Sequence, residues 1–280
     1  MWIVAALLTM FCFGISNMLF KITSGKGVSK VHLQFIFYLV SFLIMLVYGV
    51  VAEFSPFNAL TIILGATIGI LNANGNIQMS KAFEKGPASI TSPLISTNTI
   101  IPLLSAALIF HEHITLLQWI GIIVMLSSAA IIQYVPSNNS QIQIDYKPWL
   151  YRILLSIASF GILGVLMKTS SNLHIDSVNI LVSMYGGGAV YLFINSFILK
   201  EKWQRTEFAI GSTIGCISVV GYSSYFFALK TGVASIVFPI VSLSCLVVVL
   251  GSCLLFKEKL RNYQIIGILT AVAGIVLTKI

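Results

Sequence analysis

Residues 81–90 read KAFEKGPASI, and residues 227–236 read FALKTGVASI. The same offset places Pro239 on Pro93, and the register continues past Gln118 without a gap. A chance match in an apolar chain does not hold one offset over so many positions. The sequence therefore predicts two related halves joined in tandem, as expected from duplication of one structural unit.

The chain is too apolar for a water-soluble protein. Of its 280 residues, 58% are hydrophobic and 9% are charged, and its mean hydropathy is +0.98. Soluble domains carry roughly 25% charged residues, so this chain has too few polar side chains to cover a surface in water. Because helices satisfy their own backbone polar groups in lipid, we predict an all-α membrane protein. Tandem halves in such a protein are typical of secondary transporters.

Polar clusters divide the chain into apolar stretches, each close to the length of roughly 20 residues that a helix needs to cross a bilayer. The longest polar stretch, residues 136–148, is interpreted as a linker. It separates a first repeat, residues 1–135, from a second repeat, residues 149–280. The ten predicted transmembrane helices are residues 2–22, 31–51, 59–80, 88–110, 116–135, 149–168, 177–199, 208–229, 233–256 and 263–279.

The number of spans in each repeat is odd, so the second repeat enters the membrane inverted relative to the first. Lys and Arg concentrate in the connections after odd-numbered spans, and only Lys168, Lys230 and Lys279 lie on the other side. Positive side chains favour cytoplasmic loops. We therefore expect a multi-pass protein of the cell (inner) membrane with both termini outside the cytoplasm. The net charge of +8 serves this topology and does not indicate nucleic-acid binding.

Motifs for enzyme chemistry and metal binding are missing from the sequence. It contains no P-loop, no H-E-x-x-H and no G-x-S-x-G. The cysteines lie in apolar spans without a C-x-x-C pair, which favours packing over a disulfide or a metal site. In His111-Glu112-His113 the potential ligands are two residues apart, a spacing that does not share a helix face. We expect no catalytic residue, no cofactor and no metal.

A polar wall is predicted where the third and eighth spans match. Asn72 and Asn76 are four residues apart and share one helix face, and the matching part of the eighth span holds Tyr222 and Ser223. Amides inside a bilayer must face protein or water. They either bind a polar solute near the membrane midplane or join neighbouring helices by hydrogen bonds, and the sequence leaves both readings open.

The fourth and ninth spans carry prolines at matched positions, Pro93 and Pro239. Proline removes a backbone donor and bends a helix, so both positions are candidate hinges. The alternative is a purely structural kink, but its recurrence in both halves favours function. Polar residues surround the two bends and are expected to line the same cavity: Ser92, Ser96 and Asn98 in the first repeat and Ser242 in the second.

Pairs of small residues recur in the third and eighth spans. Gly65 and Gly69 match Gly211 and Gly215. Because small residues four apart let two helices approach closely, these pairs predict tight packing inside the bundle.

Lys21 and Lys168 end the first and sixth spans at matched positions. Such lysines ordinarily reach to the lipid headgroups, and the alternative is an attractive charge at each mouth of a shared path. All eight acidic residues lie at span ends or in loops. The sequence therefore offers no mid-span carboxylate of the kind that a proton-coupled cation exporter uses. A charge-neutral site favours an uncharged or zwitterionic solute, moved by facilitated diffusion or exchange.

The end of each repeat resembles a known family. Residues 228–239 fit the pattern A-L-K-x-G-x-A-S-x-x-x-P, and F-x-E-x-L-x-x-x-Q-x-x-G follows at residues 256–267. This pattern resembles the EamA-type proteins of the drug/metabolite transporter (DMT) superfamily. The Phe110-His111-Glu112 turn is also similar to the glucose/ribose-uptake branch. The resemblance implies two five-helix repeats around a central cavity, with the fifth and tenth spans at the periphery.

We therefore expect a secondary transporter, an exporter or an uptake carrier, that works by alternating access. The resemblance implies that its solute is a small polar metabolite such as an amino acid, a sugar or a nucleotide precursor. Its partners would be that solute and the lipid bilayer, with the protein as a monomer or a homodimer. The alternatives are a multidrug or lipophilic-cation exporter and a lipid-carrier flippase. Members of the family usually have cytoplasmic termini and a basic loop after the second span, whereas residues 52–56 here carry no base.

Overall fold

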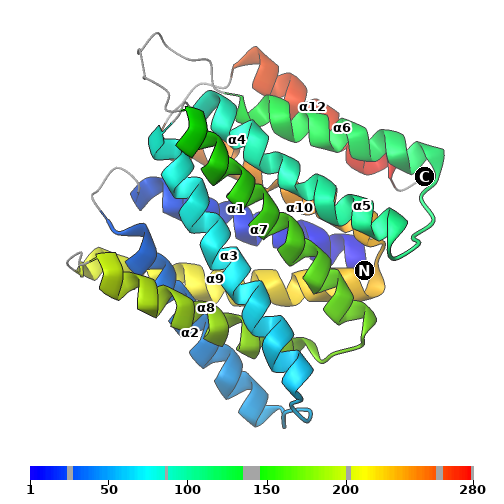
Figure 1. Cartoon of the computed structure of the whole chain (residues 1–280). Helices are drawn as coiled ribbons and strands as arrows, with labels where there is room; N and C mark the ends of the chain where they lie inside the picture. The colour runs from blue at the N-terminus through cyan, green and yellow to red at the C-terminus, as the bar shows by residue number, and fades with distance from the viewer. Residues whose placement is uncertain (24–27, 86–87, 135–145, 200–202, 257–260, 279–280) are drawn as a thin grey trace.

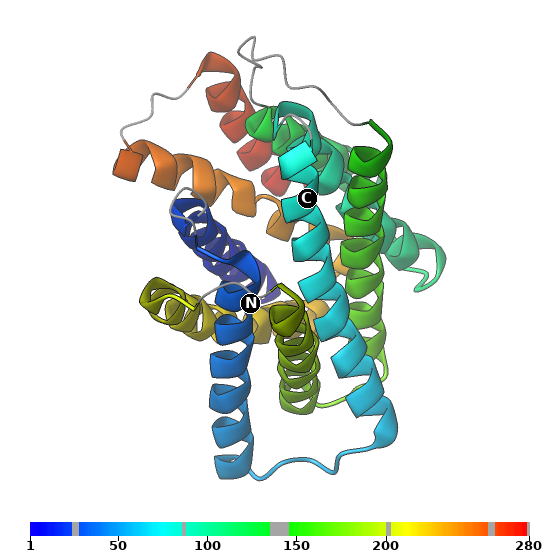
Figure 2. The same ribbon diagram turned by 60° about the vertical axis from the view of Figure 1, so that its left-hand side comes forward.

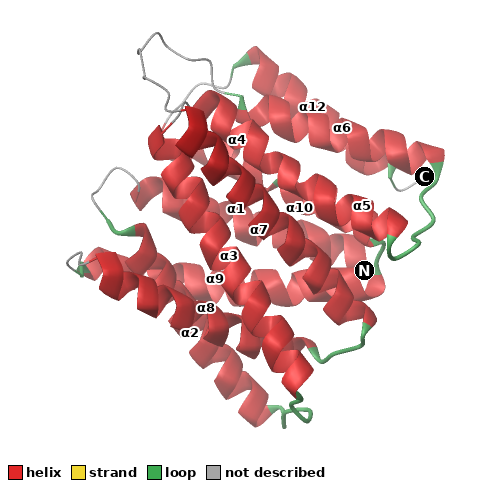
Figure 3. Cartoon of the chain, viewed as in Figure 1, coloured by secondary structure: helices red, strands yellow, loops and turns green. Residues whose placement is uncertain are grey.

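The chain is helical in the computed structural model, which describes residues 1–23, 28–85, 88–134, 146–199, 203–256 and 261–278. Figure 3 shows helices and loops, and no strand, over these residues. The helices pack into one bundle (Figure 1). The uninterrupted helices are α1 (Trp2–Thr23), α2 (Lys30–Val51), α3 (Ala59–Lys85), α6 (Leu116–Gln133), α7 (Tyr146–Asn172), α8 (Ser177–Leu199), α9 (Arg205–Thr231) and α12 (Asn262–Leu277).

Most of these helices have the length and apolarity of membrane spans. Eight stretches qualify among the described residues: α1, α2, α3, α6, α7, most of α8, α9 and the segment Ala234–Gly251. Two further apolar segments, Leu94–Leu108 and Asn262–Leu277, are shorter. The prediction of an all-helical, multi-pass membrane protein is confirmed.

The outer surface of the bundle suits a lipid environment. Large apolar side chains such as Val190, Ile198 and Leu269 are exposed there. Contiguous apolar surface of this kind is rare on soluble monomers. In a bilayer it contacts acyl chains, so exposure carries no hydrophobic penalty.

Two segments of the bundle consist of helices in series. The first contains α4 (Ala88–Ser96), a 3₁₀ turn η1 (Thr97–Thr99) and α5 (Ile100–Leu108). The second contains α10 (Ala234–Ser242) and α11 (Ser244–Phe256). Pro93 lies in α4 and Pro239 in α10, and each helix ends within one turn after its proline. The predicted bends are therefore breaks, at equivalent places in the two segments.

Matched glutamines, Gln118 and Gln264, lie in the first turns of α6 and α12. The Gln118 side chain accepts a hydrogen bond from Thr115 N at 3.0 Å, and Gln264 does the same for Arg261 N at 3.1 Å. Each glutamine occupies the third helical position and caps a backbone donor that the helix leaves unpaired. The repeated Gln-x-x-Gly pattern therefore encodes a helix start, one turn before a glycine.

Those glycines let α6 and α12 pack directly against each other. A Cβ atom at Gly121 would lie 2.9 Å from the carbonyl oxygen of Gly274. Ser128 strengthens the contact because its hydroxyl donates to Gly267 O at 2.6 Å. The pair stands at one side of the bundle (Figure 2).

Glycines also allow α3 to pack closely against α8, and α9 against α2. A Cβ atom at Gly69 on α3 would overlap the backbone carbonyl of Met184 on α8. A Cβ atom at Gly211 on α9 would lie 2.9 Å from Leu33 O on α2. The close packing predicted from the paired glycines is confirmed, and it takes place between helices of different halves.

Candidate functional site

An amide and a phenol from different halves of the chain meet in the interior. Asn72 on α3 donates through Nδ2 to Tyr222 Oη on α9 at 2.7 Å. Both residues are more than nine-tenths buried. Asn72 and Tyr222 are two of the predicted wall residues, and the structure brings them together in the interior.

A second amide extends this contact along α3. Asn76 donates through Nδ2 to the backbone oxygen of Asn72 at 3.0 Å and lies 3.4 Å from its side-chain oxygen. The spacing of four residues puts both amides on one helix face. Asn76 is half-buried, so its side chain keeps part of its surface accessible.

Two tyrosines that the sequence reading missed complete the cluster. Tyr38 on α2 and Tyr185 on α8 are both fully buried, with ring centroids 5.9 Å apart. The Tyr185 ring lies 6.1 Å from the ring of Tyr222 in an edge-on arrangement. We call Asn72, Tyr38, Tyr185 and Tyr222 the central cluster. An isolated tyrosine in an apolar span is not distinctive, and only the match between Tyr38 and Tyr185 in the two repeats could have indicated them.

The hydroxyl groups of the central cluster are unequally satisfied. Tyr38 donates to Gly69 O at 3.4 Å, and Tyr222 accepts from Asn72. Tyr185 Oη is buried and has no hydrogen-bond partner of good geometry among the described residues. An unpaired buried hydroxyl is costly, and at a functional site it is a ready contact for a ligand.

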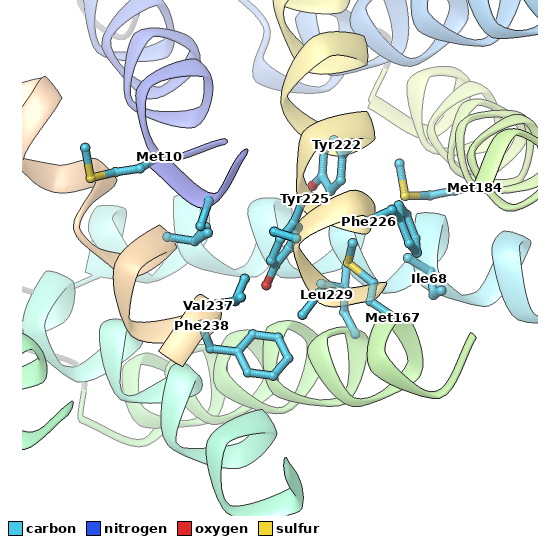
Figure 4. Close-up of a cluster of buried hydrophobic side chains, with 14 of the residues drawn as sticks. Met10, Ile68, Met167, Met184, Tyr222, Tyr225, Phe226, Leu229, Val237 and Phe238 are labelled. Carbon is cyan, nitrogen blue, oxygen red and sulfur yellow. The ribbon is translucent and has the colours of Figure 1, made fainter. Parts of the chain in front are cut away.

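Aromatic rings pack around the central cluster on its α9 side. Phe13 lies 4.7 Å from the ring of Tyr222 and 5.9 Å from that of Tyr225. Tyr225 in turn lies 6.3 Å from Phe238 on α10. Figure 4 shows Tyr225 extending from α9 toward Phe238, with Tyr222 further along the same helix. The cluster is therefore closed on this side by side chains of α1 and α10.

The predicted serines form a second group, at the helix breaks. Ser92 and Ser96 both donate to Gln133 Oε1 on α6, at 2.6 and 2.7 Å. Ser96 and Ser242 line one hollow of about 220 Å³, together with Thr97 and residues of α6. The structure thus brings the matched serines of both broken segments to one place, facing α6.

The remaining predicted residues near the bends are less informative. Asn98 donates to Ile95 O at 2.6 Å, a bond inside its own segment. Ser223 is half-buried beside Tyr222 on α9. Pro239 is buried within α10, and the side chain of Pro93 lies outside the described residues.

Lys168 lies in a buried ion pair, at the end of α7. Its Nζ atom is 3.0 Å from Glu112 Oε1 and 3.4 Å from Leu229 O. The Glu112 carboxylate also accepts from Ala234 N at 3.0 Å, from Ser235 N at 2.9 Å and from Ser235 Oγ at 2.6 Å. Glu112 therefore caps the first turn of α10, where a negative charge is favoured by the helix dipole.

The hydrogen bonds of Glu112 dominate its titration. Burial by itself raises the pKa of this carboxyl. The bonds from Ser235, Lys168 and Ala234 stabilise the ionised form and outweigh burial, so the pKa of Glu112 lies below its usual value. Its match in the second repeat, Glu258, lies outside the described residues. Lys21, the match of Lys168, is exposed in the last turn of α1.

The site offers neutral hydrogen-bonding groups and no ion chemistry over the part of the chain that is described. The polar contacts given above for Asn72, Asn76 and Tyr222 are with uncharged groups. No group of three potential metal ligands comes together among these residues, and His111 and His113 are no exception. Such an arrangement can bind a solute through amide and hydroxyl groups and aromatic rings.

Comparisons with known proteins agree with this architecture. The model of the EamA-like transporter family matches residues 1–134 and 147–280. An uncharacterized protein of Haemophilus influenzae (strain ATCC 51907 / DSM 11121 / KW20 / Rd) is 24% identical over 212 residues, which cover 74% of this chain and 72% of the relative. A protein with a known crystal structure shares the fold with a TM-score of 0.81, covering 99% of this chain and 98% of its own. Its sequence identity is 11%, so this likeness concerns the fold alone.

Proposed function

Since the chain belongs to the EamA-like transporter family, we propose that it carries a small, polar, uncharged or zwitterionic solute across the membrane by alternating access. The family is a DMT-type class of transporters, not of enzymes. The observation that carries the proposal is the bond between Asn72 and Tyr222. This bond joins α3 of the first half to α9 of the second. The same amide and hydroxyl can bind a solute instead, so solute binding would change the contact between the two halves.

Reciprocal contacts support two inverted repeats. Thr9 on α1 donates to Gly221 O on α9 at 3.2 Å, and Ser156 on α7 donates to Gly75 O on α3 at 3.1 Å. Thr9 matches Ser156, and Gly221 matches Gly75, in the two halves of the sequence. Each half therefore makes on the other the contact that it receives. A twofold pseudo-axis in the membrane plane has this consequence, and it places corresponding helices in opposite directions.

The close contacts of α1 and α7 follow the same rule. A Cβ atom at Gly14 would overlap Val247 on α11, and a Cβ atom at Gly161 would overlap Ile101 on α5. Gly14 matches Gly161, and Val247 matches Ile101. Two related packings of one duplicated unit can exchange with little change in contact free energy, which is the basis of alternating access.

The chemistry of the central cluster supports the choice of solute. An amide, three phenol groups and no charged side chain make up this cluster. A solute with a net charge would meet no compensating charge in such an interior, so its transfer from water is unfavourable. A solute with hydroxyl, amide or balanced charged groups exchanges its water for the hydrogen bonds of Asn72, Tyr222 and the unpaired Tyr185 Oη.

The network around Glu112 supports a closed path at one end of the bundle. We call this the Glu112 end. Glu112, Lys168 and Ser235 bind the loop after α5, the end of α7 and the beginning of α10 into one buried unit. The bias in Lys and Arg favours placing the Glu112 end outside the cytoplasm. The structure then corresponds to a state in which the outward path is shut.

Solute exchange in proteoliposomes tests the proposal. The purified protein is loaded with one unlabelled metabolite at a time, and uptake of the labelled metabolite is measured with and without a pH gradient. We expect exchange of at least one neutral or zwitterionic metabolite. Asn72→Leu and Asn76→Leu are expected to abolish it, whereas Asn195→Ala, which loses a bond to Tyr191 O inside its own helix, serves as the matched control. Unchanged exchange in folded Asn72→Leu protein would refute the role of the cluster.

A lipid-carrier flippase is a second candidate, favoured by one surface feature. A groove of about 560 Å³ runs between α3 and α8 and is lined by apolar residues such as Ile70 and Val190, which the bundle leaves exposed. A groove open to lipid can hold an acyl chain. Scrambling of a fluorescent lipid by proteoliposomes, compared with protein-free vesicles, distinguishes this candidate from a solute carrier.

A further inference from the structure

A fully buried carboxylate lies at the opposite end of the bundle from Glu112. Glu207, in the first turn of α9, has no exposed surface. Its two oxygens accept from Ser29 N at 3.0 Å and from Gln204 N at 3.0 Å. Glu207 therefore ties the beginning of α2 to the beginning of α9. We call this the Glu207 end.

A buried histidine faces this carboxylate. His32 on α2 is 1% exposed, and its Nδ1 atom lies 3.4 Å from Glu207 Oε2. Nδ1 has no hydrogen-bond partner of good geometry within the described part of the chain. The imidazole also stacks on the indole of Trp203, with ring centroids 3.9 Å apart and planes inclined by 6°. An imidazolium in this position pairs with the carboxylate and with the face of an aromatic ring.

The equivalent place in the other half is neutral. His32 matches Asn179 and Glu207 matches Thr61, as the packing of Gly211 on Leu33 and of Gly65 on Ile180 requires. Asn179 is also buried, and its amide donates to Ser55 O at 2.9 Å. The acid–base pair therefore occurs at the Glu207 end and has an uncharged counterpart at the Glu112 end.

We propose that His32 and Glu207 form a proton-binding site that locks α2 against α9 at the Glu207 end. A buried carboxylate without a compensating positive charge is unfavourable, and a proton on His32 supplies that charge 3.4 Å away. Histidine is the side chain whose charge ordinarily changes between about pH 5 and 8. Charged side chains on the elements around this corner include Lys30 on α2, the exposed Arg205 on α9, and Lys21 in the last turn of α1, which also packs against α9. The neighbouring part of α8 presents Phe193, which lies 5.7 Å from the ring of Phe35 on α2.

The proton would control one end of the solute path, an inference that rests on the proposed transport function. Both side chains are shut off from solvent in this structure, so proton exchange requires α2 and α9 to separate. A protonated pair stabilises the closed Glu207 end, and loss of the proton favours its opening. The equivalent residues at the Glu112 end, Asn179 and Thr61, do not titrate, so this particular site responds to pH at the Glu207 end.

The emission of Trp203 reports proton binding without any need for a solute. A stacked imidazolium quenches an indole, so in the full-length protein we expect emission to rise between pH 5.5 and 8. Trp203→Phe protein identifies this contribution against Trp2, Trp119 and Trp149. His32→Asn is expected to abolish the pH dependence of this emission. Lys30→Gln, which changes a neighbouring charge outside the pair, is the matched control and keeps the transition.

Exchange transport, measured at equal pH on both sides of the membrane, then tests the consequence. Wild-type exchange is expected to be severalfold faster at pH 8 than at pH 5.5. The double variant His32→Asn/Glu207→Thr copies Asn179 and Thr61 and is expected to lose this difference. A Trp203 transition that survives His32→Asn, or is missing in the wild type, overturns the proton site. If the transition depends on His32 but no solute exchanges at any pH, the proton site stands and the transport function is what fails.

Discussion

Lys168 and Glu112 form a buried ion pair in which Nζ lies 3.0 Å from Oε1. The pair connects the end of α7 to the first turn of α10, because the same carboxylate accepts hydrogen bonds from Ser235. Glu112 lies in the loop after α5, where the sequence alone offered only His111-Glu112-His113, a spacing that does not favour metal binding. Lys168, predicted as a charge at a path mouth, is therefore held in a contact between α7 and α10.

Removing one partner of the pair should destabilise the protein. Lys168→Met leaves the Glu112 carboxylate buried without its counter-charge, and we expect the free energy of unfolding to fall by about 3 kcal/mol. Thermal unfolding in detergent measures this change. The double variant Lys168→Met/Glu112→Gln should recover part of the loss, as coupling between contacting residues requires. Equal, additive losses for the two single changes would show that the pair contributes no coupling.

Acidification should weaken the same network. The pKa of Glu112 in the folded protein is lowered from its usual value of about 4.3. Its contribution to stability is therefore present at neutral pH and is lost as the pH falls through the lowered folded pKa. We expect the difference in melting temperature between wild type and Glu112→Gln to be constant near pH 7 and to shrink below about pH 4.3. A difference that grows on acidification would contradict the assignment.

Two glycines that pack α8 against its neighbours, Gly69 of α3 and Gly186 facing α2, should differ in their tolerance of a methyl group. Gly69→Ala places Cβ against the backbone carbonyl of Met184, which can yield only if the helices separate. We expect a loss of about 2 kcal/mol in unfolding free energy. Gly186→Ala is the matched control, because its nearest neighbour is the edge of the Phe42 ring at 3.1 Å, and a ring can move aside. Equal losses at both positions would show that backbone contact does not set this interface.

The two interior tyrosines should respond differently to loss of their hydroxyl groups. Tyr222→Phe leaves the amide of Asn72 without its partner and should destabilise the protein by about 1–3 kcal/mol. Tyr185→Phe removes a buried hydroxyl that has no good partner over the described residues, so its effect on stability should be neutral or favourable. If Tyr185 Oη binds the solute, Tyr185→Phe should nevertheless raise the solute concentration needed for half-maximal exchange. Stability and exchange measured on the same preparations separate the two effects.

Much of the architecture followed from the sequence for simple reasons. A continuous apolar stretch of about 20 residues is long enough to cross a bilayer as a helix. It forms a helix because lipid offers no hydrogen-bond partners to backbone polar groups. Bends near Pro93 and Pro239 were expected because proline cannot donate to the preceding turn, and the structure shows breaks there. The helix starts just before Gln118 and Gln264 were not predicted, although their signal is local too, since a capping box needs only neighbouring residues. All three signals act over a few residues and survive in a single sequence.

The contents of the interior depended on contacts that no local pattern encodes. Asn72 and Tyr222 were predicted as wall residues, but their direct bond joins positions 150 residues apart in the chain. Tyr38 and Tyr185 went unnoticed because a single tyrosine in an apolar span is unremarkable until its neighbours are known. His32 and Glu207 were likewise ordinary span-end residues, and 178 positions separate Glu207 from its partner Ser29.

The sequence by itself determined that this is a membrane protein, that it is helical and that it is built from two related halves. Composition and internal repetition are properties of the chain, and in lipid an unbroken apolar stretch of about 20 residues forms a helix. The tertiary structure alone decided which polar groups meet: Lys168 with Glu112, Asn72 with Tyr222 and His32 with Glu207. Each pair joins residues from different halves of the chain, and a distance across a helix interface is not written in either helix.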